Sequence, residues 1–155
     1  MITEIDSQIY QAEAEYLAQK DLGIFKSQIL YLEERLRVYE QLRDREAEIF
    51  QYVAEQINHN FPDEPELQVK RALKHWIITL RYCGMAMLSN DPLYLQQILE
   101  WLPAQIEAHQ TKKLEKNLYS YLHKRLKKNL GNDDFSILQT YLEQSKNALL
   151  NGDKS

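Results

Sequence analysis

Four histidines and one cysteine are the rarest of the side chains in this 155-residue chain that could bind a metal or haem or act as a nucleophile. The histidines, His59, His75, His109 and His123, are scattered and form no His-Glu-x-x-His pattern. Cys83 is alone, so no Cys-x-x-Cys pair and no disulfide within the chain is possible. A helical histidine can ligate haem, and His75 or His109 could reach such a pocket. A hydrogen-bonded or exposed side chain is the alternative interpretation.

Cys83 lies in the longest apolar run of the chain, residues 72–91, which reads ALKHWIITLRYCGMAMLSND. A thiol among apolar neighbours is typical of an inert buried cysteine, and a nucleophile is the alternative. Lys74, His75 and Arg81 make the run too polar for a membrane span of about 20 apolar residues. No Gly-rich phosphate loop and no acid–base pair is recognisable, so we expect a protein that is not an enzyme.

The elements that would position these residues are all predicted to be helices. Only four glycines and four prolines occur, which is typical of a single all-helical domain. Apolar residues spaced by three and four predict a central core helix from about 66 to 89. Gly84 inside it costs about 1 kcal/mol relative to alanine, a cost that a close helix crossing would offset.

The remaining helices are bounded by recognisable start and stop signals. Thr3 is a plausible N-cap for a first helix that reaches about Gln19. This helix is only weakly amphipathic, so it must dock on the body or on another chain. We expect a bend within 33–46, because a helix over 21–59 is unusually long. Asp91-Pro92 predicts a short helix to Trp101, and Pro103 starts another that breaks near 109–111. Gly131 is expected to cap the leucine-edged helix that follows. The tail 152–155 is expected to fray.

Charge is unevenly distributed along the chain, whose net charge is −4. Residues 1–66 carry a net charge of −9 and residues 67–155 a net charge of +5. This separation favours packing against a protein over binding nucleic acid. The lysine-rich face of 112–128 is a solvated helix face or, alternatively, a docking face for an acidic protein. With no signal peptide recognisable, we expect a cytosolic protein.

Several stretches resemble the phycobiliprotein subunits of cyanobacterial and red-algal phycobilisomes. Residues 72–81, ALKHWIITLR, followed by LSND at 88–91, are similar to the family's C-x-R-D-x-x-Y-Y-L-R and V-A-G-D. VAEQINHNFP at 53–62 looks like its segment ending in N-K-F-P, and YLEQSKNAL at 141–149 looks like its closing Y-L-D-Y-A-I-N-A-L. These stretches occur in the family's order and cover most of the chain.

The resemblance implies a globin-like helical bundle with an N-terminal helical extension, here residues 1–20, that packs against a partner subunit. Arg81 matches a family arginine that pairs with an acidic residue of the partner. Tyr10 and Tyr16 in the extension are further candidate partner-binding residues, because tyrosine is enriched at interfaces. The implied partners are phycobilisome subunits, a linker, or a second copy in a homodimer, in the cyanobacterial cytosol or at the cytoplasmic face of the thylakoid.

The departures from the family concern the pigment. The bilin-attaching cysteine corresponds to Ala72, the propionate-binding arginine to Lys74, and the aspartate on the pyrrole nitrogens to His75. No bilin can therefore be attached covalently at that position. We expect a protein that acts by association in assembly, structure or regulation. The alternative is non-covalent binding or handling of a bilin or haem, in a candidate pocket of Lys74, His75 and Cys83.

Overall fold

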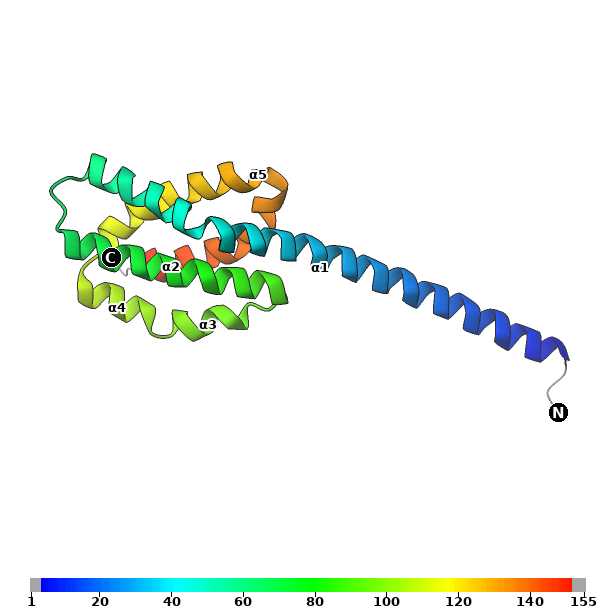
Figure 1. The fold of residues 1–155 in the computed structure, drawn as a ribbon. Helices are drawn as coiled ribbons and strands as arrows, with labels where there is room; N and C mark the ends of the chain where they lie inside the picture. The colour runs from blue at the N-terminus through cyan, green and yellow to red at the C-terminus, as the bar shows by residue number, and fades with distance from the viewer. Residues whose placement is uncertain (1–3, 152–155) are drawn as a thin grey trace. The chain divides into compact units, whose positions relative to one another are not determined.

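The computed structural model describes residues 4–151, which contain helices and no strand (Figure 1). The helices are α1 (Glu4–Asn60), α2 (Glu66–Ser89), α3 (Leu93–Leu99), α4 (Leu102–His109) and α5 (Lys112–Leu150). The prediction of an all-α protein is confirmed. The expected N-cap Thr3 and the expected frayed tail 152–155 lie outside the described residues.

Helix α1 is continuous over 57 residues, so the predicted helix end near Gln19 and the predicted bend within 33–46 are both wrong. Its sequence contains no proline, and its one glycine, Gly23, costs only about 1 kcal/mol in a helix. Most of its other residues are good helix formers, so nothing local ends it before Asn60. The chain divides into two compact units, Met1–Glu34 and Arg35–Ser155, and the boundary falls inside this helix.

The second unit encloses one apolar core, to which all five helices contribute. Figure 1 shows α3 and α4 alongside α2. The predicted bounds of the central helix are confirmed by α2. Trp76, Leu80, Gly84 and Met87 are among its buried residues. The largest fully buried side chains are those of Trp76, Ile49, Ile57, Met87, Leu95, Ile98, Leu102, Ile106, Leu118, Leu122, Leu126 and Leu138.

The connections between these helices follow the predicted stop signals. Asn90 ends α2 in the left-handed conformation, and the side chain of Asp91 accepts a hydrogen bond from the Leu93 amide at 3.0 Å. Gln110 is also left-handed, at the predicted break between α4 and α5. Gly131 has a φ of +79° inside α5, which bends there as its glycine predicted. Helix α3 ends at Leu99, short of the expected Trp101.

Gly84 lies where α2 packs against Tyr39 of α1. A Cβ at this position would lie 3.4 Å from Tyr39 Cδ2, which is ordinary van der Waals contact. We therefore expect Gly84→Ala to raise the free energy of unfolding by about 0.5–1 kcal/mol, because alanine fits and removes the glycine penalty. Gly84→Leu should lower it by about 1–3 kcal/mol through overpacking. Urea unfolding followed by circular dichroism measures both, and a loss for the alanine variant would contradict the contact distance.

Candidate functional site

The N-terminal unit presents many exposed apolar side chains. Every described residue from 4 to 34 is exposed. Twelve of these side chains are large and apolar: Ile5, Ile9, Tyr10, Tyr16, Leu17, Leu22, Ile24, Phe25, Ile29, Leu30, Tyr31 and Leu32. We call residues 4–34 the apolar segment. A single helix cannot bury such side chains by itself, so this surface is available to another protein.

The spacing within the apolar segment forms a helical stripe. Leu22, Phe25, Ile29 and Leu32 follow one another at steps of three, four and three, which places them on one face of the helix. Seven acidic residues against two lysines give residues 1–34 a net charge of −5. A surface that covers this segment must therefore be apolar and is favoured by cationic groups at its edges.

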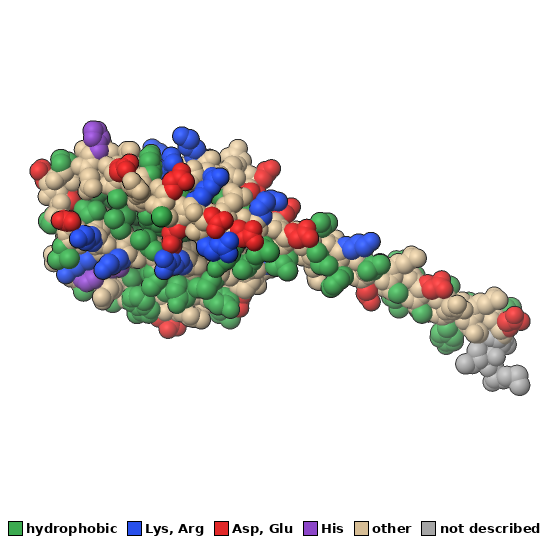
Figure 2. Space-filling view, viewed as in Figure 1, with side chains coloured by type: hydrophobic (Ala, Val, Ile, Leu, Met, Phe, Trp, Pro, Cys, Tyr) green, Lys and Arg blue, Asp and Glu red, His purple; other side chains and the backbone are tan. Residues whose placement is uncertain are grey.

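The second unit contains a groove of about 380 Å³ between α2 and α4. Its apolar wall is formed by Leu67, Ile78, Trp101 and Leu102, and its polar lining by Arg71, Lys74, His75, Gln105 and His109. No acidic side chain is among these lining residues. Figure 2 shows hydrophobic side chains gathered over α3 and α4, with lysine and arginine side chains beside them. The groove thus combines an apolar surface with positive charge.

A buried hydrogen-bond network forms the floor of this groove. The side chain of Glu115 on α5 is fully buried, and that of His75 on α2 is only 8% exposed. Glu115 Oε2 lies 3.0 Å from His75 Nδ1 and also accepts a hydrogen bond from the Thr111 hydroxyl. Because a carboxylate only accepts, His75 Nδ1 is the donor of this contact. Glu115 therefore fixes the tautomer and orientation of His75.

The network continues from His75 to α4. His109 Nδ1 lies 3.3 Å from His75 Nε2, and the two rings are nearly parallel, 8° apart. The backbone carbonyl of His109 also accepts a hydrogen bond from the Gln68 side chain at 2.8 Å. Partial burial lowers the pKa of His109, and the positive charge of Arg71 lowers it further. The network joins α2, α4 and α5 beneath the groove.

The predicted pocket residues divide into two groups. Lys74 and His75 line the groove together, and His109, the other histidine expected to reach a pocket, lies beside them. Cys83 is not there. It is fully buried in the core, with Sγ 3.3 Å from the Ser145 hydroxyl, and burial raises the pKa of its thiol to about 12. Ala72 is also fully buried, so its position faces the core rather than the groove.

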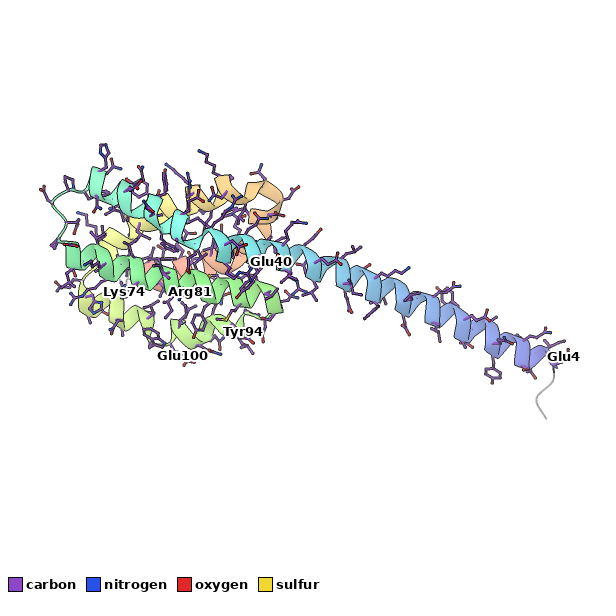
Figure 3. All side chains as sticks on the ribbon, viewed as in Figure 1. Glu4, Glu40, Lys74, Arg81, Tyr94 and Glu100 are labelled. Carbon is purple, nitrogen blue, oxygen red and sulfur yellow. The ribbon has the colours of Figure 1, made fainter. Side chains whose placement is uncertain are left out.

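Arg81, the candidate partner-binding arginine, pairs with an acidic residue of its own chain. It is exposed and forms a two-pronged ion pair with Glu46 of α1, with N–O distances of 2.7 and 2.9 Å. The hydrogen bond to Glu46 raises the pKa of Arg81. An exposed pair of this kind contributes about 1 kcal/mol or less. Figure 3 shows Arg81 and Lys74 on the same helix, α2.

Sequence reasoning did not single out Arg71 and Trp101 in the groove lining, nor Glu115 in the network beneath it. Glu115 carried a detectable signal. It is the only acidic residue in the lysine-rich stretch 112–128, and it directly follows Leu114 on the inward, leucine-lined side of the helix. An acid at an inward position predicts a buried partner. Arg71 and Trp101 gave no comparable signal, because their meeting depends on how α4 packs on α2.

No protein-family model matches the chain, and neither a curated protein nor a solved structure was found to match it. Among residues 4–151, none of the helices combines the length and the apolar character needed to cross a membrane. Function must therefore be argued from the two surfaces themselves.

Proposed function

We propose that this chain is a non-enzymatic association protein whose apolar segment docks on another helical protein. The observation that carries the proposal is the set of twelve exposed, large apolar side chains within residues 4–34. Most helical stability in proteins comes from packing of an apolar face, and a large exposed apolar surface marks an interaction site. A stable interface uses about 20–30 residues from each side, which is the size of this segment.

The partner that fits is a second copy of the chain. The apolar segment is acidic, whereas the groove offers Arg71 and Lys74 beside the apolar surface of Leu67 and Trp101. Each copy would place its segment, including Tyr10 and Tyr16, over the groove of the other. Such a reciprocal arrangement closes a two-fold dimer with two equal contacts.

Light scattering of the full-length protein tests this proposal. We expect a dimer at micromolar concentration that weakens between about 0.1 M and about 0.5 M salt, because salt screens the charge attraction. Arg71→Glu/Lys74→Glu should dissociate it, whereas the matched charge change Lys127→Glu/Lys128→Glu, away from the groove lining, should not. A monomer mass at high micromolar concentration, or equal dissociation by both variants, would contradict the proposal.

A phycobiliprotein-like, globin-type bundle is part of this proposal. It is supported by the order of the resembling stretches, the all-α architecture and the bounds of α2. It makes a phycobilisome subunit or linker, in the cyanobacterial cytosol, the alternative partner to a second copy. A pull-down from cyanobacterial lysate would return such a subunit with the wild type and lose it with Arg71→Glu/Lys74→Glu.

A second candidate function is non-covalent binding of a tetrapyrrole, a bilin or haem, in the groove. The observation that favours it is the gathering of Lys74, His75, Arg71 and His109 beside Trp101. Ammonium and guanidinium groups bind propionate carboxylates, and Trp101 offers a flat apolar face to a ring system. Covalent attachment at Ala72 remains excluded by the absent thiol.

Titration with biliverdin and with haemin tests this candidate. We expect a red-shifted or sharpened ligand band that Arg71→Glu/Lys74→Glu abolishes, and no zinc-fluorescent band on a denaturing gel. The absence of any spectral change at tens of micromolar ligand would remove it. Because a docked segment would cover the same groove, light scattering of the same samples reads the dimer while the spectra read the ligand.

A further inference from the structure

A second cavity is formed by α5 alone and is lined almost entirely by groups that bind anions. Gly131 breaks the helical path of α5, and the two halves on either side of it pack against each other. His123 in the first half meets Phe135 in the second edge to face at 5.0 Å, and Lys146 Nζ lies 5.6 Å from the centre of the Tyr119 ring. Between the halves lies a cavity of about 380 Å³.

The lining of this cavity is cationic and rich in hydrogen-bond donors. Lys116, Ser120, His123 and Lys124 come from the first half of α5, and Lys146 and Asn147 come from the second half. Glu143 is the only acidic lining residue, so three lysines face one carboxylate. This local excess of positive charge occurs in a chain whose net charge is negative.

From this placement we propose that the cavity between the two halves of α5 binds the phosphate group of a small phosphorylated molecule. Ammonium groups from Lys116, Lys124 and Lys146 neutralise a phosphate, and the Ser120 hydroxyl, the Asn147 amide and the His123 ring supply directional donors. A single carboxylate would leave most of these donors unused. The cavity is also within the size range of small-ligand pockets, and larger than a bare phosphate ion needs.

The charge around His123 gives this site a pH dependence. Burial lowers the pKa of His123 in the free protein, and the nearby Lys127 and Lys146 lower it further, whereas Glu143 opposes them. A bound phosphate dianion would favour the imidazolium. Its pKa is then higher in the complex than in the free protein, so, while the phosphate remains a dianion, binding takes up a proton at His123 and strengthens as the pH falls toward the pKa of the free protein.

The test uses inorganic phosphate and glycerol phosphate as probes, at constant ionic strength with acetate as the anion control. We expect calorimetry to give a dissociation constant in the millimolar range or tighter for glycerol phosphate, the ester. In ¹H–¹⁵N spectra, the ring signals of His123 should shift when the ester binds. Lys146→Ala should weaken binding at least about tenfold. Lys128→Ala, a lysine of the same helix outside the cavity lining, should change it less than about twofold.

His123→Gln keeps a donor in the cavity but cannot be protonated, so it should lose the proton uptake by His123 and keep only the pH dependence of the phosphate's own ionisation. Equal losses for Lys146→Ala and Lys128→Ala, or equal effects of acetate and phosphate, would overturn the proposal, since both indicate only a diffuse positive face. Binding of inorganic phosphate but not of the ester would overturn the assignment of a phosphorylated molecule. Measuring in a background that prevents self-association keeps this result separate from the proposed dimer.

Discussion

Phe25→Glu/Ile29→Glu is expected to convert the associated protein to a monomer. Both side chains are exposed, 58% and 39%, and both belong to the stripe that the apolar segment presents. Each change removes about 1.5–3 kcal/mol of apolar burial from the complex and places a charge in it. Because a reciprocal dimer contains the site twice, the dissociation constant should rise by at least about 100-fold, measured by light scattering or sedimentation equilibrium.

The control is Ser27→Glu/Gln28→Glu, which adds the same charge to the same turns at polar positions. It should change the dissociation constant by less than about tenfold. Helix content should be preserved in both variants, because glutamate is at least as good a helix former as the residues replaced. If the apolar-face variant associates as the wild type does, the segment is not the docking surface. If the control dissociates equally, charge alone is responsible.

The helices of the second unit could be predicted because local signals mark them. The bounds of α2 follow from Pro65 and the Asn90-Asp91-Pro92 stop, and the bend in α5 follows from Gly131. The length of α1 could not be predicted, because no local signal distinguishes one long helix from two helices joined end to end. A typical helix length favoured a break that no residue enforces.

Only part of the groove could be predicted from the sequence. Lys74 and His75 are adjacent on one helix, so their proximity was certain once α2 was predicted. The meeting of His75 with His109 and Glu115 spans 34 and 40 residues, and it depends on how three helices pack. Periodicity gives the inward face of each helix but not which inward faces meet.

Cys83 was predicted to share a pocket with Lys74 and His75, and it does not. Three helical turns separate it from Ala72, so the two share a face of α2, and both are buried. That face is the core face, whereas Lys74 is exposed at the groove. Membership of one helix therefore did not establish membership of one pocket. Nine residues, or about two and a half helical turns, separate Lys74 from Cys83, which places the two on opposite faces of α2.

Glu115→Ala is expected to cause the largest loss of stability among single substitutions at the groove. Glu115 is fully buried and accepts hydrogen bonds from both Thr111 and His75. Its removal leaves two buried donors without their acceptor and opens a cavity, which together should lower the free energy of unfolding by about 3 kcal/mol. For a domain of this size that corresponds to a fall in Tm of about 6–12 °C, measured by calorimetry or circular dichroism.

Glu115→Gln keeps the size of the side chain and its hydrogen-bond acceptor but removes the negative charge. Its amide oxygen still accepts from His75 and Thr111, and among the described residues Glu115 Oε1 has no hydrogen-bond partner that the NH₂ group would displace. The loss should therefore be about half of that in Glu115→Ala or less. Because the two side chains bind each other, their effects should not add. His75→Ala should lower the free energy of unfolding of the Glu115→Ala variant by at least about 1 kcal/mol less than it lowers that of the wild type. Full additivity, or an unchanged Tm in Glu115→Ala, would mean that the buried network does not join α2, α4 and α5.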